Sequence, residues 1–240
     1  MAWVCVLGMH RSGTSCLTGI LQKLGVELGD VHTENLHNRR GNRENSRVVS
    51  LNDALLRANQ AAWNAPRVIT RWDTSHASER DAIVQSLQQR GAEHRGFKDP
   101  RTLFTLPFWL ERLPAPRFIG TYRHPLHVAR SLQARDGSSL DEGCRLWVLY
   151  NARLLELARL HCFPLVHFDQ DADDYLDDVL GKLAGLNPDA ADRAAAREFF
   201  EPALRHQRGQ PDGNESLPAG VQTLYRHLQQ YDKAYNAAHG

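Results

Sequence analysis

The sequence predicts an α/β fold in three layers, with a central, mainly parallel sheet flanked by helices. Short apolar runs bounded by turn residues alternate with longer segments of helical periodicity, the pattern of repeated strand-helix units. The first apolar run leads into a glycine-rich turn and then into an amphipathic segment. A chain of 240 residues can bury one sizeable core and is short for two. We therefore expect a single domain over residues 1–240.

Five apolar runs are the expected strands, at residues 3–7, 67–70, 96–98, 118–122 and 165–168. Apolar residues recur at helical spacing in the stripes 17–24, 48–55 and 140–158, and a last helix is expected over 219–238. The polar segments 29–45 and 207–218 show neither period, so we expect loops on the surface there.

Bulk charge excludes some classes of partner. Lys and Arg number 29 against 28 Asp and Glu, a formal net charge of +1, which gives no support to long-range attraction of nucleic acid or membrane. No window approaches the roughly 20 apolar residues of a membrane span, and no signal peptide precedes the first strand. The expectation is a cytoplasmic protein. Its four cysteines are far apart and lack metal-ligand spacing, so we expect buried, reduced thiols.

The clearest motif is G-x-x-x-x-G-T-S, which runs from Gly8 to Ser15 after the first expected strand. The strand, the turn and the helix that opens after it aim free N–H groups and the positive helix end at one point. Gly13 allows close approach of the backbone to a ligand, Thr14 and Ser15 add hydroxyl donors, and Arg11 adds a fixed charge. The motif therefore predicts an oxyanion site in a P-loop-like fold.

Thr14 stands where a P-loop nucleotide triphosphatase needs a lysine. In kinases and ATPases that lysine reaches the β- and γ-phosphates, and an aspartate helps to hold magnesium. Arg123, Asp99 and Asp169 follow other expected strands, which leaves an acidic metal partner open. A sulfuryl group carries less negative charge than a phosphoryl group, so arginine, lysine and N–H donors can suffice for its transfer. The loop favours a reaction without metal.

The run Arg11-Ser12-Gly13-Thr14-Ser15 resembles the donor loop of the sulfotransferase family, which commonly reads Arg/Lys-x-Gly-Thr/Ser-Thr/Ser after a first strand. The family uses 3′-phosphoadenosine-5′-phosphosulfate (PAPS) as sulfuryl donor. The resemblance implies that these five residues hold the 5′-phosphosulfate, and that the acceptor is a hydroxyl or amine of a glycan or small molecule.

The family also grips the 3′-phosphate of the donor with an arginine at a strand end and a serine eight residues later. Arg123 and Ser131 stand in this relation, and Pro125 suits the first turn of the helix between them. Arg205 and Arg208 belong to a basic stretch that resembles the late loop over the 3′-phosphate and adenosine. The resemblance implies donor contacts for all of these cations, although the late stretch also fits a solvated loop.

Lys98-Asp99-Pro100-Arg101 looks like an element found in many bacterial members of the family. At the carboxyl end of an expected strand, Lys98 and Arg101 would point toward the crevice where open α/β sheets bind ligands. We expect Lys98 in the catalytic machinery and Arg101 near the donor, with Asp99 orienting either cation. A simple salt-bridged turn is the other interpretation.

The transfer needs a base for the acceptor proton, within hydrogen-bond reach. Glu44 is the first candidate, because it lies in a Gly-x-x-Glu-Asn segment that bacterial relatives often carry; a glutamate opening a helix is also a common capping residue. His10, inside the glycine-rich loop, is the second, with His32 and His37 behind it.

Other interpretations stay open. The chain could be a P-loop kinase, for which we would expect magnesium-dependent binding of ATP, or a protein that binds the nucleotide without turnover. Trp147 and Tyr150 could line the acceptor pocket or belong to the core. Residues 168–171 and 183–186 depart from the Tyr-Glu-Asp-Leu and Phe-Leu-Gly-Leu sequences of relatives, which leaves C-terminal contacts undefined.

Overall fold

The computed structural model describes residues 2–32, 41–186, 188–200 and 217–239. In these ranges five strands form one all-parallel sheet in the order β2-β3-β1-β4-β5. The strands are β1 (Ala2–Gly8), β2 (Val26–Glu27), β3 (His94–Lys98), β4 (Arg117–Tyr122) and β5 (Leu165–His167). The predicted α/β class with a parallel sheet is confirmed.

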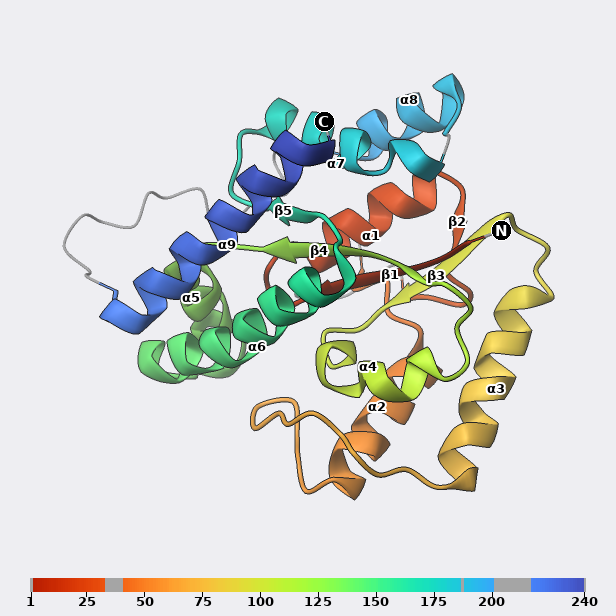
Figure 1. Cartoon of the computed structure of the whole chain (residues 1–240), viewed down its shortest axis with the longest axis horizontal. Coiled ribbons are helices and arrows are strands. Elements are labelled where there is room, and N and C mark those ends of the chain that lie inside the picture. Colours follow the sequence, from red (N-terminus) through yellow and green to blue (C-terminus); the bar gives the residue numbers. More distant parts are fainter. Residues whose placement is uncertain (1, 33–40, 187, 201–216, 240) are drawn as a thin grey trace.

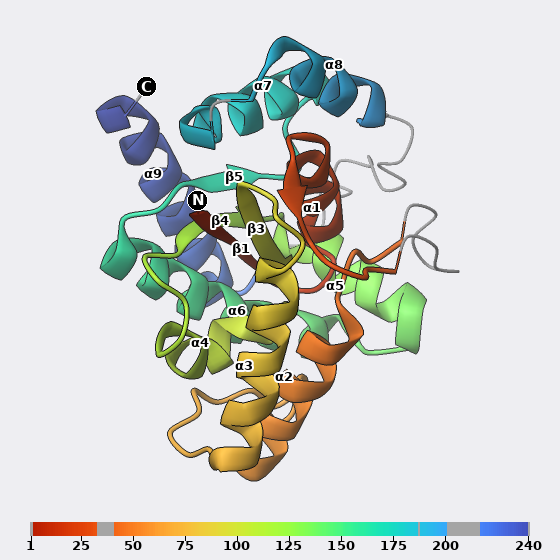
Figure 2. The same ribbon diagram turned by 90° about the vertical axis from the view of Figure 1, so that its right-hand side faces the viewer.

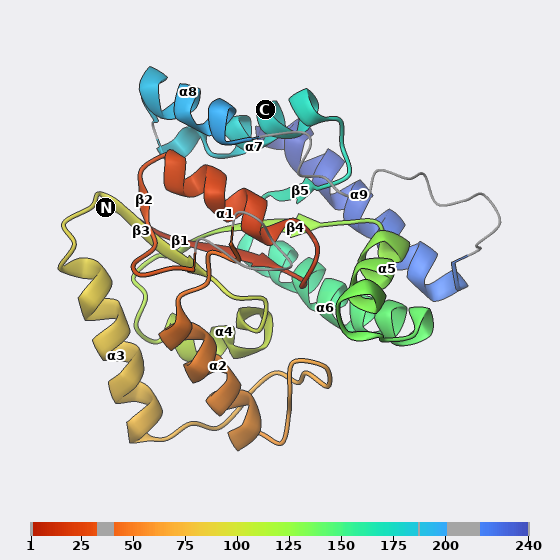
Figure 3. The ribbon, with the colours of Figure 1, turned by 180° about the vertical axis from the view of Figure 1, so that it is seen from behind.

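Helices cover both faces of the sheet (Figure 1). One face carries α1 (Thr14–Lys23), α7 (Ala172–Lys182) and α8 (Ala190–Phe199), with a short 3-10 turn η1 (Ala184–Leu186) after α7. The other face carries α2 (Ser46–Ala58), α3 (Thr74–Gln88), α4 (Thr102–Leu110), α5 (Pro125–Asp136), α6 (Leu140–His161) and α9 (Ala219–His239). The three layers are also visible from the side and from behind (Figure 2, Figure 3).

The central strand β1 explains how the two layers of helices are held. Its side chains alternate between the two hydrophobic clusters: Val4 and Val6 pack into one, and Cys5 and Leu7 into the other. Because both faces are covered, the strand reads as a continuous apolar run in the sequence. No helix in the described ranges has the length and apolarity to cross a bilayer.

The strand predicted at residues 67–70 is wrong, and β2 was not predicted. Of the four residues only Ile69 is buried, and its N–H donates to the carbonyl of Phe104 rather than to a strand. The next two N–H groups, of Thr70 and Arg71, donate to the side chain of Asn59. The segment is therefore an extended connection whose polar groups find partners outside the sheet.

None of the four cysteines is in a disulfide, but they are not all buried. Cys5 and Cys144 are buried, Cys16 is half-buried and Cys162 is exposed, so the prediction of a buried thiol fails for Cys162. Burial raises the pKa of Cys5 to about 12, which keeps this thiol protonated at neutral pH.

Gly96 sets the spacing between the two strands at the centre of the sheet. It lies opposite Val4 in the β1-β3 ladder, and a Cβ at this position would lie 1.9 Å from the Val4 carbonyl oxygen. Since that oxygen belongs to a buried backbone, it has little freedom to move.

Gly96→Ala should therefore destabilise the fold by about 3 kcal/mol, because the strands must separate to admit the methyl group. Urea unfolding of the two proteins measures the difference. Gly181→Ala is the matched control: a Cβ there meets nothing within 4 Å in α7. That change should be neutral or stabilising by up to about 1 kcal/mol. Equal stability of Gly96→Ala and the native chain would contradict the packing argument.

Candidate active site

The turns after β3, β1, β4 and β5 meet at one edge of the sheet because the strands are parallel. Every described residue that the sequence placed in the donor site or the catalytic machinery lies in these turns, at the start of the helix that follows one of them, or on the segments packed against them. The carboxyl edge of the sheet is therefore the candidate active site. Arg205 and Arg208 lie outside the described residues, as does His37.

The loop between β1 and α1 has the backbone geometry of an anion site. Gly8, Arg11 and Gly13 have φ of 156°, 66° and 86°. Gly13 is the N-cap of α1; in the described part of the chain no side chain caps this helix end, and its first turn holds no acidic residue. The N–H groups at the positive end of α1 therefore have no side-chain cap among the described residues, which suits the predicted anion site.

Gly13 has a second constraint besides its left-handed backbone. A Cβ on it would lie 2.2 Å from Cδ2 of Phe168, the residue after β5. Gly13 therefore allows the turn after β5 to close against the loop, and no other residue would fit there without moving an aromatic ring. The loop is therefore positioned by two strands: it continues directly from β1, and it packs against the residue that follows β5.

Arg11 and Ser131 come from motifs 120 residues apart in the chain and are joined directly. Nε of Arg11 donates to Oγ of Ser131, on α5, at 2.7 Å. Burial lowers the pKa of Arg11, and the charges of Arg135 and Arg123 lower it further. The loop after β1 and helix α5, the two halves of the predicted donor site, are therefore in contact. They bring positive charges close together, and an anion bound between them would reduce the repulsion.

Arg123 is held by Asp169, which the sequence did not single out as a site residue. Nε of Arg123 donates to Oδ1 of Asp169 at 2.9 Å, and Nη1 lies 3.4 Å from the carbonyl oxygen of Arg11. Asp169 also accepts from the backbone N–H of His124 at 2.8 Å and contacts Nδ1 of His127 at 3.0 Å. Burial would raise the pKa of Asp169, but these hydrogen bonds and the Arg123 charge hold it below the ordinary value. The sequence signal was available, because Asp169 follows the end of β5.

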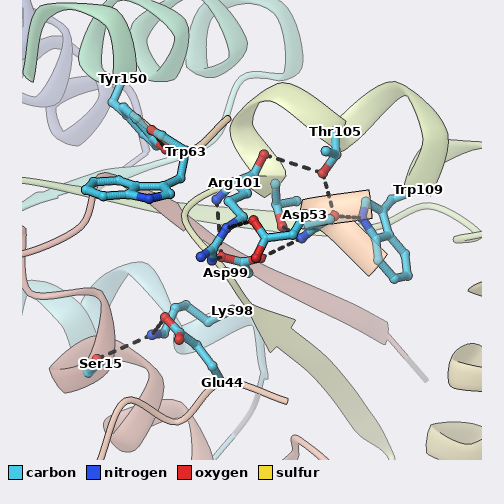
Figure 4. A network of polar contacts seen from close by, with 12 residues as sticks. Ser15, Glu44, Asp53, Trp63, Lys98, Asp99, Arg101, Thr105, Trp109 and Tyr150 are labelled. Carbon is cyan, nitrogen blue, oxygen red and sulfur yellow. Dashed lines mark hydrogen bonds and ion pairs between the residues drawn. The ribbon is translucent and has the colours of Figure 1, made fainter. Parts of the chain in front are cut away.

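Lys98, Ser15 and Glu44 form one cluster beside the loop (Figure 4). Nζ of Lys98 lies 2.7 Å from Oε1 of Glu44 and 3.3 Å from Oγ of Ser15. The Lys98 side chain is 1% exposed and that of Glu44 18%. Burial lowers the pKa of Lys98, and Glu44 opposes the shift. Glu44 is not the cap of α2, because the side chain of Asn45 caps that helix.

Arg101 belongs to a buried polar network rather than to an isolated turn. Its guanidinium pairs with Asp99 at 2.7 Å and with Asp53 at 2.6 Å. Asp99 in turn accepts from Nδ2 of Asn52 at 2.8 Å, and Oδ1 of Asn52 accepts from Nε1 of Trp109 at 2.9 Å. Burial raises the pKa of Asp99. The network fixes α2 and α4 to the end of β3 (Figure 4).

The aromatic residues of α6 are buried, yet they adjoin the site. Trp147 and Tyr150 have no exposed surface; Nε1 of Trp147 donates to the carbonyl of Arg123, and the Tyr150 hydroxyl donates to the carbonyl of Trp63. His10 packs edge-on against Trp63 and Tyr150, with ring centroids 5.4 and 5.6 Å away. Burial lowers the pKa of His10 well below its ordinary value, helped by neighbouring cations. His10 is therefore neutral at pH 7.

The residues present fit a nucleotide donor with two anionic groups. The uncapped end of α1 suits one anion, and Arg11, Arg123 and Lys98 lie around it at the same edge of the sheet. The Oγ of Ser12 is buried and has no partner among the described residues, so it can serve a ligand. The same residues contain no cluster of three or more His, Cys, Asp or Glu arranged for a metal.

Comparison with known proteins supports a sulfotransferase domain. A model of the sulfotransferase family matches residues 4–164, a stretch that includes the loop after β1, Lys98, Arg123 and Ser131. A search among curated proteins finds no match.

Solved structures add evidence on the fold. The sulfotransferase domain of the Synechococcus PCC 7002 olefin synthase is similar, with a TM-score of 0.53 and 17% identity, over 98% of this chain and 94% of that one. The sulfotransferase STF1 from Mycobacterium tuberculosis H37Rv has a TM-score of 0.48 and 13% identity, over 95% and 76%. At such identities the first likeness shows the fold alone.

Arg11→Ala and Arg123→Ala should each weaken binding of 3′-phosphoadenosine-5′-phosphate by about 2 kcal/mol, roughly 30-fold in Kd. Each change removes a charge-assisted hydrogen bond donor from the carboxyl edge of the sheet. Isothermal titration calorimetry measures the affinities. Arg57→Ala, an exposed arginine in the last turn of α2, is the control and should bind like the native chain. Unchanged affinity in both site variants would refute the assignment of the donor site.

Proposed function

Because the chain belongs to the sulfotransferase family, we propose that it moves the sulfuryl group of PAPS to a hydroxyl or amine of a glycan or small molecule. The transfer is in-line and independent of metal. The observation that carries the proposal is the contact of Arg11 with Ser131, which brings the two donor motifs together. One sulfotransferase domain over residues 1–240 accounts for the chain.

The geometry of the loop and of α5 supports the following assignment of the donor site. Residues 11–15 receive the 5′-phosphosulfate at the N-terminus of α1, through backbone N–H groups, two hydroxyls and the Arg11 guanidinium. Arg123 and Ser131 receive the 3′-phosphate. Arg101, 13% exposed at its side chain, is an outer donor contact. Arg205 and Arg208 complete the adenosine end by resemblance to the family.

Glu44 and Lys98 act on the acceptor during the transfer. When bound, the donor supplies the sulfuryl group and leaves as 3′-phosphoadenosine-5′-phosphate. The Glu44 carboxylate takes the proton of the acceptor hydroxyl as the new bond to sulfur forms. The Lys98 ammonium, 2.7 Å from Glu44 and 3.3 Å from Ser15, bridges the base to the loop and opposes negative charge that develops between them.

His10 is the second candidate for the base, and its neutral imidazole can also take a proton. Glu44 is preferred because its carboxylate lies beside Lys98 and Ser15, at the mouth of the anion site. The cap of α2 is supplied by Asn45, which leaves the Glu44 carboxylate free of a structural task at that helix end.

Glu44→Gln should reduce turnover about 100-fold or more, because the amide cannot accept the proton, while the affinity for 3′-phosphoadenosine-5′-phosphate stays within about twofold. Release of that product from PAPS, followed with an active acceptor, measures the rate. His10→Gln is the matched comparison and should keep most of the turnover at saturating acceptor. A large loss in His10→Gln with native turnover in Glu44→Gln would assign the proton to His10 instead.

The ligand itself is tested by thermal shift. 3′-Phosphoadenosine-5′-phosphate at a hundredfold excess over Kd should raise the midpoint by about 5 to 10 °C. ATP with magnesium should give a much smaller shift, because Thr14 stands in the place of the lysine that a kinase needs. Stabilisation by magnesium and ATP alone would favour a kinase and contradict the proposal.

A further inference from the structure

A second set of side chains lies next to the Lys98-Glu44 pair, and two of its members, Trp63 and Asp53, have no task in donor binding or proton transfer as proposed. We propose that Trp63, His10 and the Asp53-Arg101 ion pair form the acceptor subsite, and that the acceptor is an uncharged sugar ring. This inference rests on the proposed sulfuryl transfer and names the class of acceptor for it.

The position of the set fits an acceptor. Figure 4 shows Lys98, Glu44 and Ser15 on one side of Arg101, and the rings of Trp63 and Tyr150 on the other. A hydroxyl placed at the Glu44 carboxylate therefore belongs to a molecule whose remainder faces Arg101 and the indole ring of Trp63, since Tyr150 is fully buried behind it. Lys98 is the last residue of β3 and Arg101 is the N-cap of α4, three residues later, which fixes their spacing.

His10 points to a ligand with hydrogen-bonding groups. Its Nε2 is buried and has no hydrogen-bond partner among the described residues. Buried polar nitrogens are rarely left unpaired, so a ligand or a water must complete this one. Because the imidazole is neutral, it can exchange a hydrogen bond with a hydroxyl and offers no charge to an anion.

The two arginines beside Trp63 and His10 are already paired with carboxylates. Arg101 pairs with Asp53 and Asp99, and Arg135 pairs with Asp136 at 2.6 Å. Asp53 keeps 31% of its side chain exposed. An acidic acceptor would meet this carboxylate beside an arginine that is already paired, whereas sugar hydroxyls can donate to the carboxylate and accept from the guanidinium.

Trp63 supplies a fixed flat surface. Its carbonyl accepts from the Tyr150 hydroxyl at 2.8 Å, and a bridge between Ala62 and Ala65 closes the turn around it. The guanidinium of Arg135 lies 5.0 Å from the centre of the indole ring. The side chain is only partly buried, so part of the indole can pack against the C–H groups of a sugar ring while the rim groups bind hydroxyls.

Transfer from radiolabelled PAPS tests the class of acceptor. The neutral probes are the methyl glycosides of glucose, galactose and N-acetylglucosamine; the acidic probes are the matched glucuronide and galacturonide; para-nitrophenol is the planar phenol. We expect at least one neutral glycoside to be labelled about tenfold faster than its uronate and faster than the phenol. Faster labelling of the uronates or the phenol would overturn the inference. So would no labelling of any neutral glycoside by a protein that binds 3′-phosphoadenosine-5′-phosphate.

Variants separate the subsite from the donor site. Trp63→Ala should raise the KM for the glycoside about tenfold with unchanged affinity for 3′-phosphoadenosine-5′-phosphate, and Trp63→Phe should recover part of it. Asp53→Asn should raise the rate on the uronate relative to the neutral glycoside by about threefold or more, because a like charge is gone.

Asp81→Asn is the control for charge, since Asp81 also pairs with arginine but lies on α3 away from the site. It should leave the ratio of the two rates unchanged. A ratio unchanged in Asp53→Asn, or a KM unchanged in Trp63→Ala, would overturn the subsite. Failure of the native protein to bind 3′-phosphoadenosine-5′-phosphate would instead overturn the proposed function on which the subsite rests.

Discussion

The central place of β1 between two parallel neighbours is the constraint on which the site depends. β3 and β4 both run alongside β1 in the same direction, so their final residues are brought to the loop that begins at Gly8. Lys98 ends β3 and Arg123 follows β4, so both cations reach the anion site without any long-range charge on the protein. Close contact of the strands needs Gly96, and close contact of the loop with the turn after β5 needs Gly13.

The cations of the site differ in whether a carboxylate offsets their positive charge. Arg123 lies against Asp169, Lys98 against Glu44, and Arg101 against Asp99. Arg11 is bonded to the neutral Ser131, with two further arginines near enough to lower its pKa. An anion in the loop would first offset the repulsion between Arg11 and the two neighbouring arginines. The other cations already have carboxylate partners and would share their charge between the carboxylate and the anion. A chain with a net charge of +1 can thus bind a multiply charged donor, because the positive potential is made locally.

Sequence reasoning identified residues that lie close together in the structure although they are far apart in the chain. The glycine loop was predicted from its own spacing, and Lys98, Arg123 and Ser131 were predicted from the resemblance to the sulfotransferase family; the structure brings all of them to one edge of the sheet. The strand at residues 67–70 failed because β-propensity says nothing about which partner an N–H group finds. Trp63 and Arg135 were missed as site residues because tertiary packing, and no spacing in the chain, places them there. Asp169, which follows the end of β5, had been considered only as a partner for a metal and not for Arg123.

Helix α2 connects the proposed base, Glu44, to the proposed acceptor subsite. Glu44 precedes its cap, Asn45, and Asp53 lies on the helix beyond the buried Asn52. Asn52, in the middle of α2, binds Asp99 after β3 and Trp109 on α4. These hydrogen bonds fix the position of α2 along the edge of the sheet. The carboxylates of Glu44 and Asp53 therefore reach Lys98 and Arg101 together. A shift of α2 would change the distance of the base from the loop and the shape of the subsite at once. The rigid element that aligns the base is thus also the one that selects what the base can reach.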